Sequence, residues 1–185
     1  MSGRILTIGY GARQMEEFLR LLHKYEVEFL IDVRVVPYSS YRPEFSREPL
    51  AEAVEAAGFR YVHMGDQLGG RPEEDRFWID DKKVDYEQVK ELPEYQRGIE
   101  RLLDAHAQGY TVCLMCSEQR PEECHRSKLV SESLVERGVP VEHIDADGEL
   151  RGHDEVIRRL TKGQLTFDFA PPKFTSKPLK RRRSA

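Results

Sequence analysis

Five short apolar segments, interleaved with stretches of helical periodicity, constrain the fold of this chain more than any other feature. The apolar segments have the length of strands and end in polar turns; they span residues 4–10, 28–33, 59–64, 110–115 and 141–144. Apolar residues recur at helical spacing in residues 14–25, 47–57, 93–108, 124–137 and 154–160. This alternation is typical of a parallel sheet with helices on both faces.

We therefore expect an α/β protein, a three-layer α/β/α fold with a mostly parallel five-stranded sheet, Rossmann-like or flavodoxin-like. The length of 185 residues suits one domain, which we place at residues 1–163. Residues 164–185 are expected to form a C-terminal basic tail. From residue 171 onward there are six basic residues and no acidic one, whereas the rest of the chain has a net charge of −10. Such a tail indicates either a solubilising arm or electrostatic attachment to nucleic acid.

The N-terminal segment and the cysteine content indicate the compartment. No segment approaches the roughly 18 apolar residues that a membrane helix needs, and the start MSGRILTIGY has no apolar signal-peptide core. The three cysteines, Cys113, Cys116 and Cys124, are an odd number for a disulfide framework. We expect a cytoplasmic protein with free thiols and no membrane partner.

Polar residues and glycines follow the predicted strands at the point where each strand ends. In chain order they are Gly9 and Tyr10, then Asp32 and Arg34, then His63, then Cys116 and Glu118. In open parallel sheets, ligands bind in the crevice beyond the carboxyl ends of the strands. We therefore expect the functional site at this edge.

Asp32 and Arg34 are two residues apart, so that both side chains can leave the strand in the same direction. In one interpretation they form an ion pair that ties the loop to the sheet. In the other, the Arg34 guanidinium binds a phosphate or carboxylate, and Asp32 orients it or acts as a general acid–base.

The segment CLMCSEQRPEECHR, residues 113–126, has the richest chemistry in the chain. Cys113 is expected to be a buried apolar residue in the middle of a strand. Cys116 falls at the strand's end, while Cys124 and His125 fall near a helix N-terminus, where thiol pKa values are lowered and anions bind. Arg126 adds positive charge.

Three interpretations of this segment remain open. Cys116 beside His125 would be an activated nucleophile for covalent catalysis. Cys116, Cys124 and His125 with a carboxylate would bind a metal, although the spacing C-x7-C-H matches none of the usual zinc patterns. Otherwise Cys124 packs under the helix, and His125 and Arg126 bind an anion. The third interpretation is favoured, so that no cofactor and no metal are predicted.

Aromatic and basic residues alternate in the loop after the second strand. Tyr38, Tyr41 and Arg42 suit stacking on nucleic-acid bases. The same composition also suits an ordinary lid that packs on the core.

The chain resembles the domain of unknown function 488 family through four segments. They are TIGYGARQMEEFLRLL, FLIDVRVVPYSSYRPEF, LAEAVEAAGFRYVHMGDQLGG and CLMCSEQRPEECHR. The resemblance implies a three-layer α/β fold and no assigned reaction. It also implies a polar cluster formed by Asp32, Arg34, Pro37, Glu118, Cys124, His125 and Arg126. One position departs from the family pattern, because Tyr10 follows Gly9 where we associate a Ser or Thr with the family.

The tail segment QLTFDF, residues 164–169, resembles the sliding-clamp-binding peptides of DNA repair and replication proteins. Gln164, Leu165, Phe167 and Phe169 would dock in a hydrophobic pocket of the clamp, although Phe167 stands where Leu is usual. Alternatively, the apolar residues hold the tail against the surface of the domain itself.

Our leading hypothesis is an enzyme that acts on a phosphate-bearing substrate, a nucleotide or nucleic acid. The anion-binding residues would be Arg34, Arg126, Gly9, Tyr10 and Cys124; the catalytic candidates are Asp32, Glu118, Cys116 and His125. The rivals are a non-catalytic module that binds nucleic acid or a sliding clamp, and a metal-dependent enzyme. The hypothesis requires the Asp32–Arg34 loop and the Cys124–Arg126 segment to meet in space and to shape one hollow that suits an anion.

Overall fold

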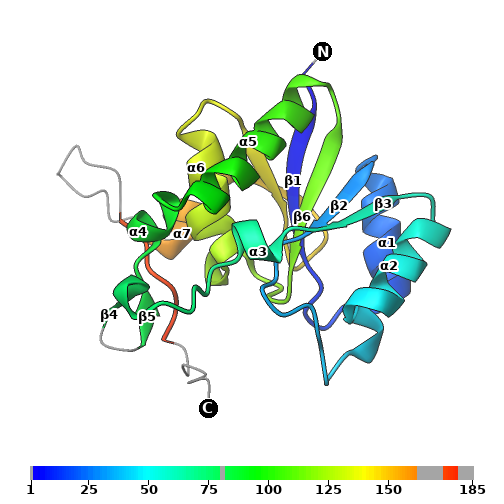
Figure 1. Ribbon diagram of the computed structural model, residues 1–185. Coiled ribbons are helices and arrows are strands. Elements are labelled where there is room, and N and C mark those ends of the chain that lie inside the picture. The colour runs from blue at the N-terminus through cyan, green and yellow to red at the C-terminus, as the bar shows by residue number, and fades with distance from the viewer. Residues whose placement is uncertain (1, 80–81, 162–172, 179–185) are drawn as a thin grey trace.

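The computed structural model describes residues 2–79, 82–161 and 173–178, and a six-stranded sheet forms its centre (Figure 1). The strand order is β3-β2-β6-β1-β7-β8. Five strands are parallel, and β8 pairs with β7 in the antiparallel direction. The strands are β1 (Arg4–Gly9), β2 (Phe29–Asp32), β3 (Arg60–His63), β6 (Thr111–Cys116), β7 (Val141–Ile144) and β8 (Leu150–Gly152).

Successive residues of the central strands point into two separate apolar cores, one on each face of the sheet. In β1, Ile5 belongs to one core and Leu6 to the other. In β6, Val112 and Cys113 divide in the same way. Strands buried on both faces need continuous apolar runs, which is why the sequence predicts them well. The predicted α/β class is confirmed.

The number of strands differs from the prediction, because the sequence predicted five and the structure has six in the main sheet. The additional strand, β8, returns beside β7 through a turn in which Gly148 has a φ of 80°. A glycine adopts this left-handed conformation without steric cost. The strand itself reads LRG, with a single large apolar residue, so that no period-two pattern reveals it.

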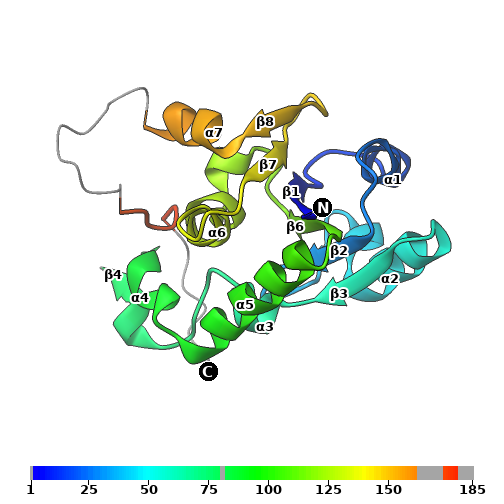
Figure 2. The same ribbon diagram turned by 90° about the horizontal axis from the view of Figure 1, so that it is seen from above.

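The helices cover both faces of the sheet, which gives three layers (Figure 2). Helices α1 (Met15–Lys24) and α2 (Arg47–Ala56) pack on one face. The opposite face is covered by α3 (Gly65–Leu68), α5 (Pro93–Ala107) and α6 (Glu132–Val135), with the π-helical segment η4 (Arg126–Ser131) directly before α6. Helix α7 (His153–Leu160) lies beside β7 and β8.

Residues 65–92, which carry no predicted strand or helix, fold into several short elements. After α3 come the 3-10 turn η2 (Asp75–Phe77), a two-stranded sheet of β4 (Trp78–Ile79) and β5 (Lys83–Val84), and helix α4 (Tyr86–Lys90). Further 3-10 turns are η1 (Pro43–Phe45) and η3 (Pro121–Glu123). These elements are too short for periodicity to reveal them.

The C-terminal residues 173–178 lie against this small sheet. Ser176 donates its backbone N–H to the Val84 carbonyl at 3.1 Å, and its hydroxyl accepts from the Val84 N–H at 2.9 Å. The ring of Phe174 is buried in the adjoining core. Part of the predicted tail is therefore packed on the domain.

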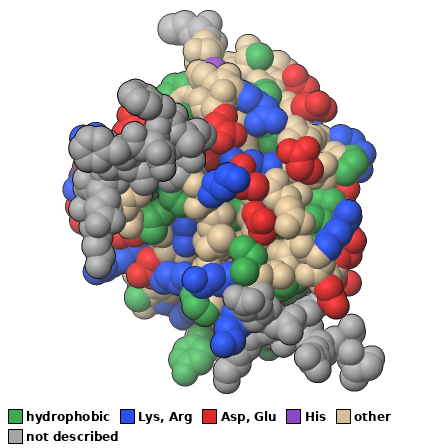
Figure 3. Space-filling view, turned by 90° about the vertical axis from the view of Figure 1, so that its left-hand side faces the viewer, with side chains coloured by type: hydrophobic (Ala, Val, Ile, Leu, Met, Phe, Trp, Pro, Cys, Tyr) green, Lys and Arg blue, Asp and Glu red, His purple; other side chains and the backbone are tan. Residues whose placement is uncertain are grey.

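The face that includes this C-terminal segment shows positive and negative side chains intermixed rather than separated (Figure 3). This agrees with a charged-residue content of 34%. Within the described part of the chain, no helix has the length and apolar composition to cross a membrane.

Candidate active site

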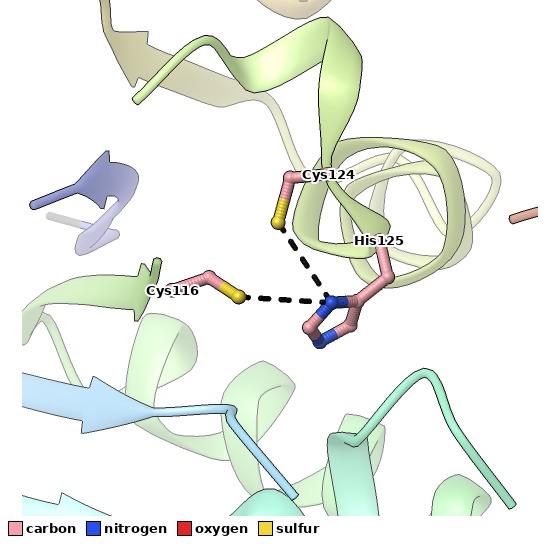
Figure 4. A group of neighbouring side chains, drawn as sticks. All are labelled: Cys116, Cys124 and His125. Atoms are coloured by element: carbon pink, nitrogen blue, oxygen red, sulfur yellow. Dashed lines mark hydrogen bonds between the residues drawn. The ribbon is translucent and has the colours of Figure 1, made fainter. Parts of the chain in front are cut away.

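Two thiols and an imidazole converge at the carboxyl edge of the sheet (Figure 4). Cys116 is the last residue of β6, and the chain returns through η3 to Cys124 and His125, directly before η4. The Nδ1 atom of His125 lies 3.8 Å from Cys116 Sγ and 3.7 Å from Cys124 Sγ. All three atoms lie within 4.8 Å of one another.

The imidazole of His125 is fixed by contacts with two other segments. Its Nε2 lies 3.2 Å from the backbone oxygen of Val33. Because a carbonyl only accepts, Nε2 carries the hydrogen, and Nδ1 faces the thiols as a hydrogen-bond partner. A Cβ atom on Gly70 would lie 2.6 Å from the Cβ of His125, so that a glycine is required for this close approach. The Asp32–Arg34 loop and the Cys124–Arg126 segment meet, as predicted.

Glu118 lies next to the first thiol. Cys116 Sγ donates to its Oε2 at 3.1 Å, and the Ser117 hydroxyl donates to the same oxygen at 3.2 Å. The carboxylate is therefore held beside the sulfur atoms, at a distance suitable for proton transfer.

The two thiols have pKa values shifted in opposite directions. The hydrogen bond with Cys124, followed by burial, raises the pKa of Cys116. Burial also opposes ionisation of Cys124, but the Cys116 hydrogen bond and the charges of Arg126 and His125 outweigh it and hold the pKa of Cys124 low. Burial lowers the pKa of His125, but the Cys124 thiolate overcomes this and raises it. Cys124 is thus the thiol that ionises first.

Arg126 lies beneath the site, with its guanidinium directed at the protein itself. Its Nη1 and Nη2 donate to the carbonyl oxygens of Glu118 and Gln119 at 2.6 and 3.2 Å, and its Nε donates to the Thr7 hydroxyl at 3.2 Å. The residue is fully buried. In this geometry Arg126 holds the backbone of the loop that presents Glu118.

Gly9 and Tyr10 contribute packing at the end of β1. A Cβ on Gly9 would lie 1.7 Å from the backbone oxygen of Glu118, so only glycine lets β1 end against that loop. The Tyr10 ring is buried and stacks on Phe45 with centroids 4.5 Å apart. Both residues shape the wall of the site.

Asp32 and Arg34 form a buried bidentate ion pair. Arg34 donates from Nε to Oδ1 at 2.8 Å and from Nη2 to Oδ2 at 2.6 Å. Tyr61 donates to the same Oδ2 at 2.8 Å, so that the Asp32 carboxylate can accept few further hydrogen bonds. The Nη1 atom of Arg34 is buried and has no hydrogen-bond partner among the described residues. This nitrogen remains available to an anion.

Lys128 and Tyr86 also lie near the thiols, and the sequence did not single them out. Burial lowers the pKa of Lys128, and the nearby negative charges of Cys124 and Glu118, which would raise it, do not outweigh this effect. The residue is 6% exposed, and its amine forms no ion pair or hydrogen bond with the described residues. Burial and the same two charges raise the pKa of Tyr86, a residue of α4. Lys128 follows Cys124 by one helical turn, a spacing that could have indicated it; Tyr86 lies in a segment without a motif.

The aromatic loop and the tail residues lie apart from this cluster. Tyr38 and Tyr41 are 69% and 93% exposed. Arg42 pairs with Glu44 at 2.8 Å and also donates to the Arg13 carbonyl. The predicted clamp-binding residues, Gln164, Leu165, Phe167 and Phe169, lie outside the described residues.

A buried hydrogen-bonded chain extends from Arg126 past β1 and β7 to α7 and α6, on one face of the sheet. The Thr7 hydroxyl donates to His143 Nδ1 at 2.8 Å, and His143 Nε2 lies 2.9 Å from His153 Nδ1. His153 Nε2 in turn donates to Glu132 at 3.0 Å. Arg126 therefore occupies one end of a polar chain that is satisfied throughout.

Two surface cavities lie away from the thiols. One of about 260 Å³ is lined by residues of β2, β3 and α5, and one of about 350 Å³ is lined by Arg120, Asp145 and Arg159, among others. The thiols themselves are only 4% and 1% exposed, for Cys116 and Cys124 respectively. The two thiols are therefore covered by the surrounding chain, whereas His125 is partly exposed.

The fold and the cluster together define a three-layer α/β protein with a cysteine–histidine–carboxylate constellation at the carboxyl edge of its sheet. The family model described as domain of unknown function DUF488 matches residues 14–133, and the chain belongs to that family. Comparison with curated proteins and with solved structures gave no match. The matched region includes every member of the cluster.

Proposed function

We propose that this protein is an enzyme that acts on a phosphate-bearing substrate, a nucleotide or nucleic acid, at the carboxyl edge of the sheet. The observation that carries the proposal is the side chain of Lys128, a residue only 6% exposed, whose amine makes no ion pair or hydrogen bond with the described residues and lies close to the charges of Cys124 and Glu118. A buried cation without a partner is costly unless a ligand anion compensates it. The amine is thus suited to hold a phosphate.

Arg34 supplies a second donor for the same anion. Its Nη1 is buried and has no hydrogen-bond partner in the described part of the chain, while the remainder of the guanidinium is held by Asp32. A guanidinium fixed in this way donates to phosphate oxygens at little entropic cost. In this proposal Lys128 and Arg34 take the anion-binding role, and Arg126 positions the loop between them.

Glu118 is the general acid–base in this proposal. Among the described residues, its carboxylate receives side-chain hydrogen bonds only from Cys116 and Ser117, whereas that of Asp32 is occupied by Arg34 and Tyr61. A carboxylate with free lone pairs can accept the proton of an attacking water and return it to the leaving oxygen. Asp32 then serves to orient Arg34.

The test is hydrolysis of phosphate monoesters and diesters, with nucleotides and oligonucleotides as substrates. Glu118→Gln is expected to lower kcat by roughly 10²–10⁴-fold, the range for loss of a general acid–base. The control is Glu123→Gln, which changes a nearby exposed carboxylate that pairs with Lys177. Equal losses in both variants, or no activity of the wild type on any of these esters, would overturn the proposal.

Ligand binding gives an independent measurement. Pyrophosphate and nucleotides are expected to raise the Tm of the wild type, because a ligand that binds only the folded state stabilises it. Lys128→Met removes the charge with little change in volume and is expected to abolish this shift. A shift that persists in Lys128→Met would refute the role of the amine.

A second candidate function is binding of single-stranded nucleic acid through the loop that contains Tyr38 and Tyr41. The exposure of both rings favours it, because exposed aromatic rings can stack on bases. Tyr41→Ala should weaken oligonucleotide binding by about 1–3 kcal/mol, or about 5–150-fold. Ile79→Ala, at another exposed apolar residue, is the control and should leave binding unchanged.

Binding to a DNA sliding clamp through residues 164–169 is a separate proposal, which rests on the sequence alone. Phe174 packs on the domain, so that deletion of the whole tail would also disturb the fold. The sharper test is the double change Phe167→Ala and Phe169→Ala, with clamp binding measured by calorimetry. Unchanged binding, or no binding by the wild type, would dismiss the idea.

A further inference from the structure

We propose that Cys116, Cys124 and His125 bind a divalent metal ion of the zinc class. The inference goes beyond the reaction proposed above, because the ion can be bound whatever the substrate is. It rests on the chemistry of the donor set, on the separations of the donor atoms and on the contacts that orient them.

The donor set selects for zinc. Two thiolates and one imidazole form the ligand combination found in structural and catalytic zinc sites. Thiolates disfavour magnesium and calcium, which bind oxygen ligands. Both sulfur atoms are nearly inaccessible, and all three cysteines of the chain are free thiols. Buried thiols gathered around one imidazole nitrogen are therefore suited to a soft cation.

The separations of the donor atoms agree with tetrahedral coordination. In tetrahedral coordination, zinc lies about 2.3 Å from a thiolate sulfur and about 2.0–2.1 Å from an imidazole nitrogen, which places the sulfur about 3.6 Å from the nitrogen. The observed distances from His125 Nδ1 to Cys116 Sγ and Cys124 Sγ are 3.8 and 3.7 Å. All three donor atoms lie within 4.8 Å of one another, so that small side-chain adjustments suffice.

The contacts around the donors orient them as metal ligands are usually oriented. His125 donates its other ring N–H to the Val33 carbonyl, an arrangement common for metal-bound histidines that leaves Nδ1 free for the ion. Cys124 Sγ accepts the Arg126 backbone N–H at 3.4 Å. The nearby positive charge of Arg126 offsets part of the negative charge that the thiolates bring to the site.

Glu118 completes the site without being one of the three ligands in this proposal. Its Oε2 lies 3.1 Å from Cys116 Sγ, so that the carboxylate is adjacent to one of the proposed ligands. A site with three protein ligands and an open fourth position is the arrangement of catalytic rather than structural zinc. A water or a substrate oxygen would occupy that position, within reach of the carboxylate.

The spacing C-x7-C-H hides this site from motif searches because one thiol ends a strand and the other precedes a helix. Zinc patterns in sequences describe ligands held by one compact turn or hairpin. Here the loop with η3 separates Cys116 from Cys124, and the fold of that loop returns the chain to the first thiol. Only the three-dimensional arrangement brings the donors together.

The test is metal analysis of the full chain, purified under reducing conditions without chelators or metal-affinity resin. We expect close to one equivalent of zinc, retained in Cys113→Ala and lost in Cys124→Ser and His125→Gln. Cys113 is the matched control, since it is a buried thiol of the same strand that packs in the opposite core. Loss of a ligand should weaken zinc binding by more than the roughly 10–100-fold that removing a ligand's hydrogen-bond partner costs.

A second measurement needs no variant and guards against misfolding of the substituted chains. Cobalt(II) added to metal-free wild type should produce a thiolate-to-cobalt charge-transfer band and the intense visible bands of tetrahedral cobalt, both abolished by zinc. No such bands, a Cys116–Cys124 disulfide in the reduced preparation, or full zinc in Cys124→Ser would overturn the proposal. A protein that binds zinc but hydrolyses no phosphate ester would retain the metal site and refute the proposed reaction. A protein that hydrolyses these esters but binds neither zinc nor cobalt(II) would retain the reaction and refute the metal site.

Discussion

Replacement of Gly9 by alanine tests whether the end of β1 sets the position of Glu118. The added Cβ would lie 1.7 Å from the Glu118 backbone oxygen and 2.6 Å from its carbonyl carbon, whereas ordinary contact begins near 3.4 Å. The loop must therefore shift by more than an atomic radius. That shift also breaks the hydrogen bond of 2.6 Å from Arg126 Nη1 to the same oxygen.

The expected cost follows from these two effects. Overpacking costs about 1–3 kcal/mol, and loss of a hydrogen bond to a charged group costs about 1.5–3 kcal/mol, which together give about 2.5–6 kcal/mol. With a urea m-value of about 2 kcal/mol/M, the unfolding midpoint should fall by about 1.2–3 M. Urea unfolding followed by circular dichroism measures this shift.

Gly152→Ala is the matched control, since a Cβ there has no atom within 4 Å and its φ of −65° is ordinary for alanine. Its unfolding free energy should change by no more than about 0.5 kcal/mol. Equal stability of the two variants would refute the reasoning. Zinc content should fall in Gly9→Ala as well, because the displaced loop connects the two thiols.

Three other predictions concern the buried polar chain, the helix packing and the C-terminal segment. Burial, followed by the charges of His153 and Arg126, holds the pKa of His143 well below 6.5. Below that pH the unfolded chain therefore binds a proton at this position while the folded chain does not. The free energy of unfolding should consequently fall by up to about 1.4 kcal/mol for each pH unit by which the pH is lowered. His143→Gln should remove this slope, and an unchanged slope in the variant would contradict the prediction. Tyr95→Phe should lower the free energy of unfolding in urea by about 1–2 kcal/mol, because it removes the buried hydroxyl that donates to the Leu129 carbonyl. An unchanged free energy of unfolding would show that this hydrogen bond does not contribute to stability. Phe174→Ala should make the C-terminal segment more sensitive to limited proteolysis, because its ring is 9% exposed; wild-type resistance would show that the ring does not anchor it.

The sequence predicted the parallel part of the sheet because burial on both faces demands apolar runs. The predicted strand at 141–144 has the bounds of β7; β1 ends one residue before its predicted end, and β6 is shifted by one residue at both ends. The antiparallel strand Leu150–Gly152 and the small sheet β4–β5 were not predicted. Their stability comes from contacts with distant segments, such as Ser176 on Val84, which no local pattern records.

The location of the candidate site was predictable, but the roles of its members were not. Strand order places the ends of β2 and β6 side by side, and the contact between Val33 and His125 follows from that order. Whether an arginine faces a ligand or the protein depends on the path of the loop around it. Arg126 was therefore expected to bind an anion, although its donors face backbone carbonyls, and Lys128 was overlooked although its amine has no partner among the described residues.

The most direct test of the account is the electron density around His125 in crystals grown with zinc, recorded at the zinc absorption edge. The account predicts one anomalous peak about 2.3 Å from both Cys116 Sγ and Cys124 Sγ and about 2.0–2.1 Å from His125 Nδ1. A structure with no peak there, or with the two sulfur atoms joined to each other, would contradict it.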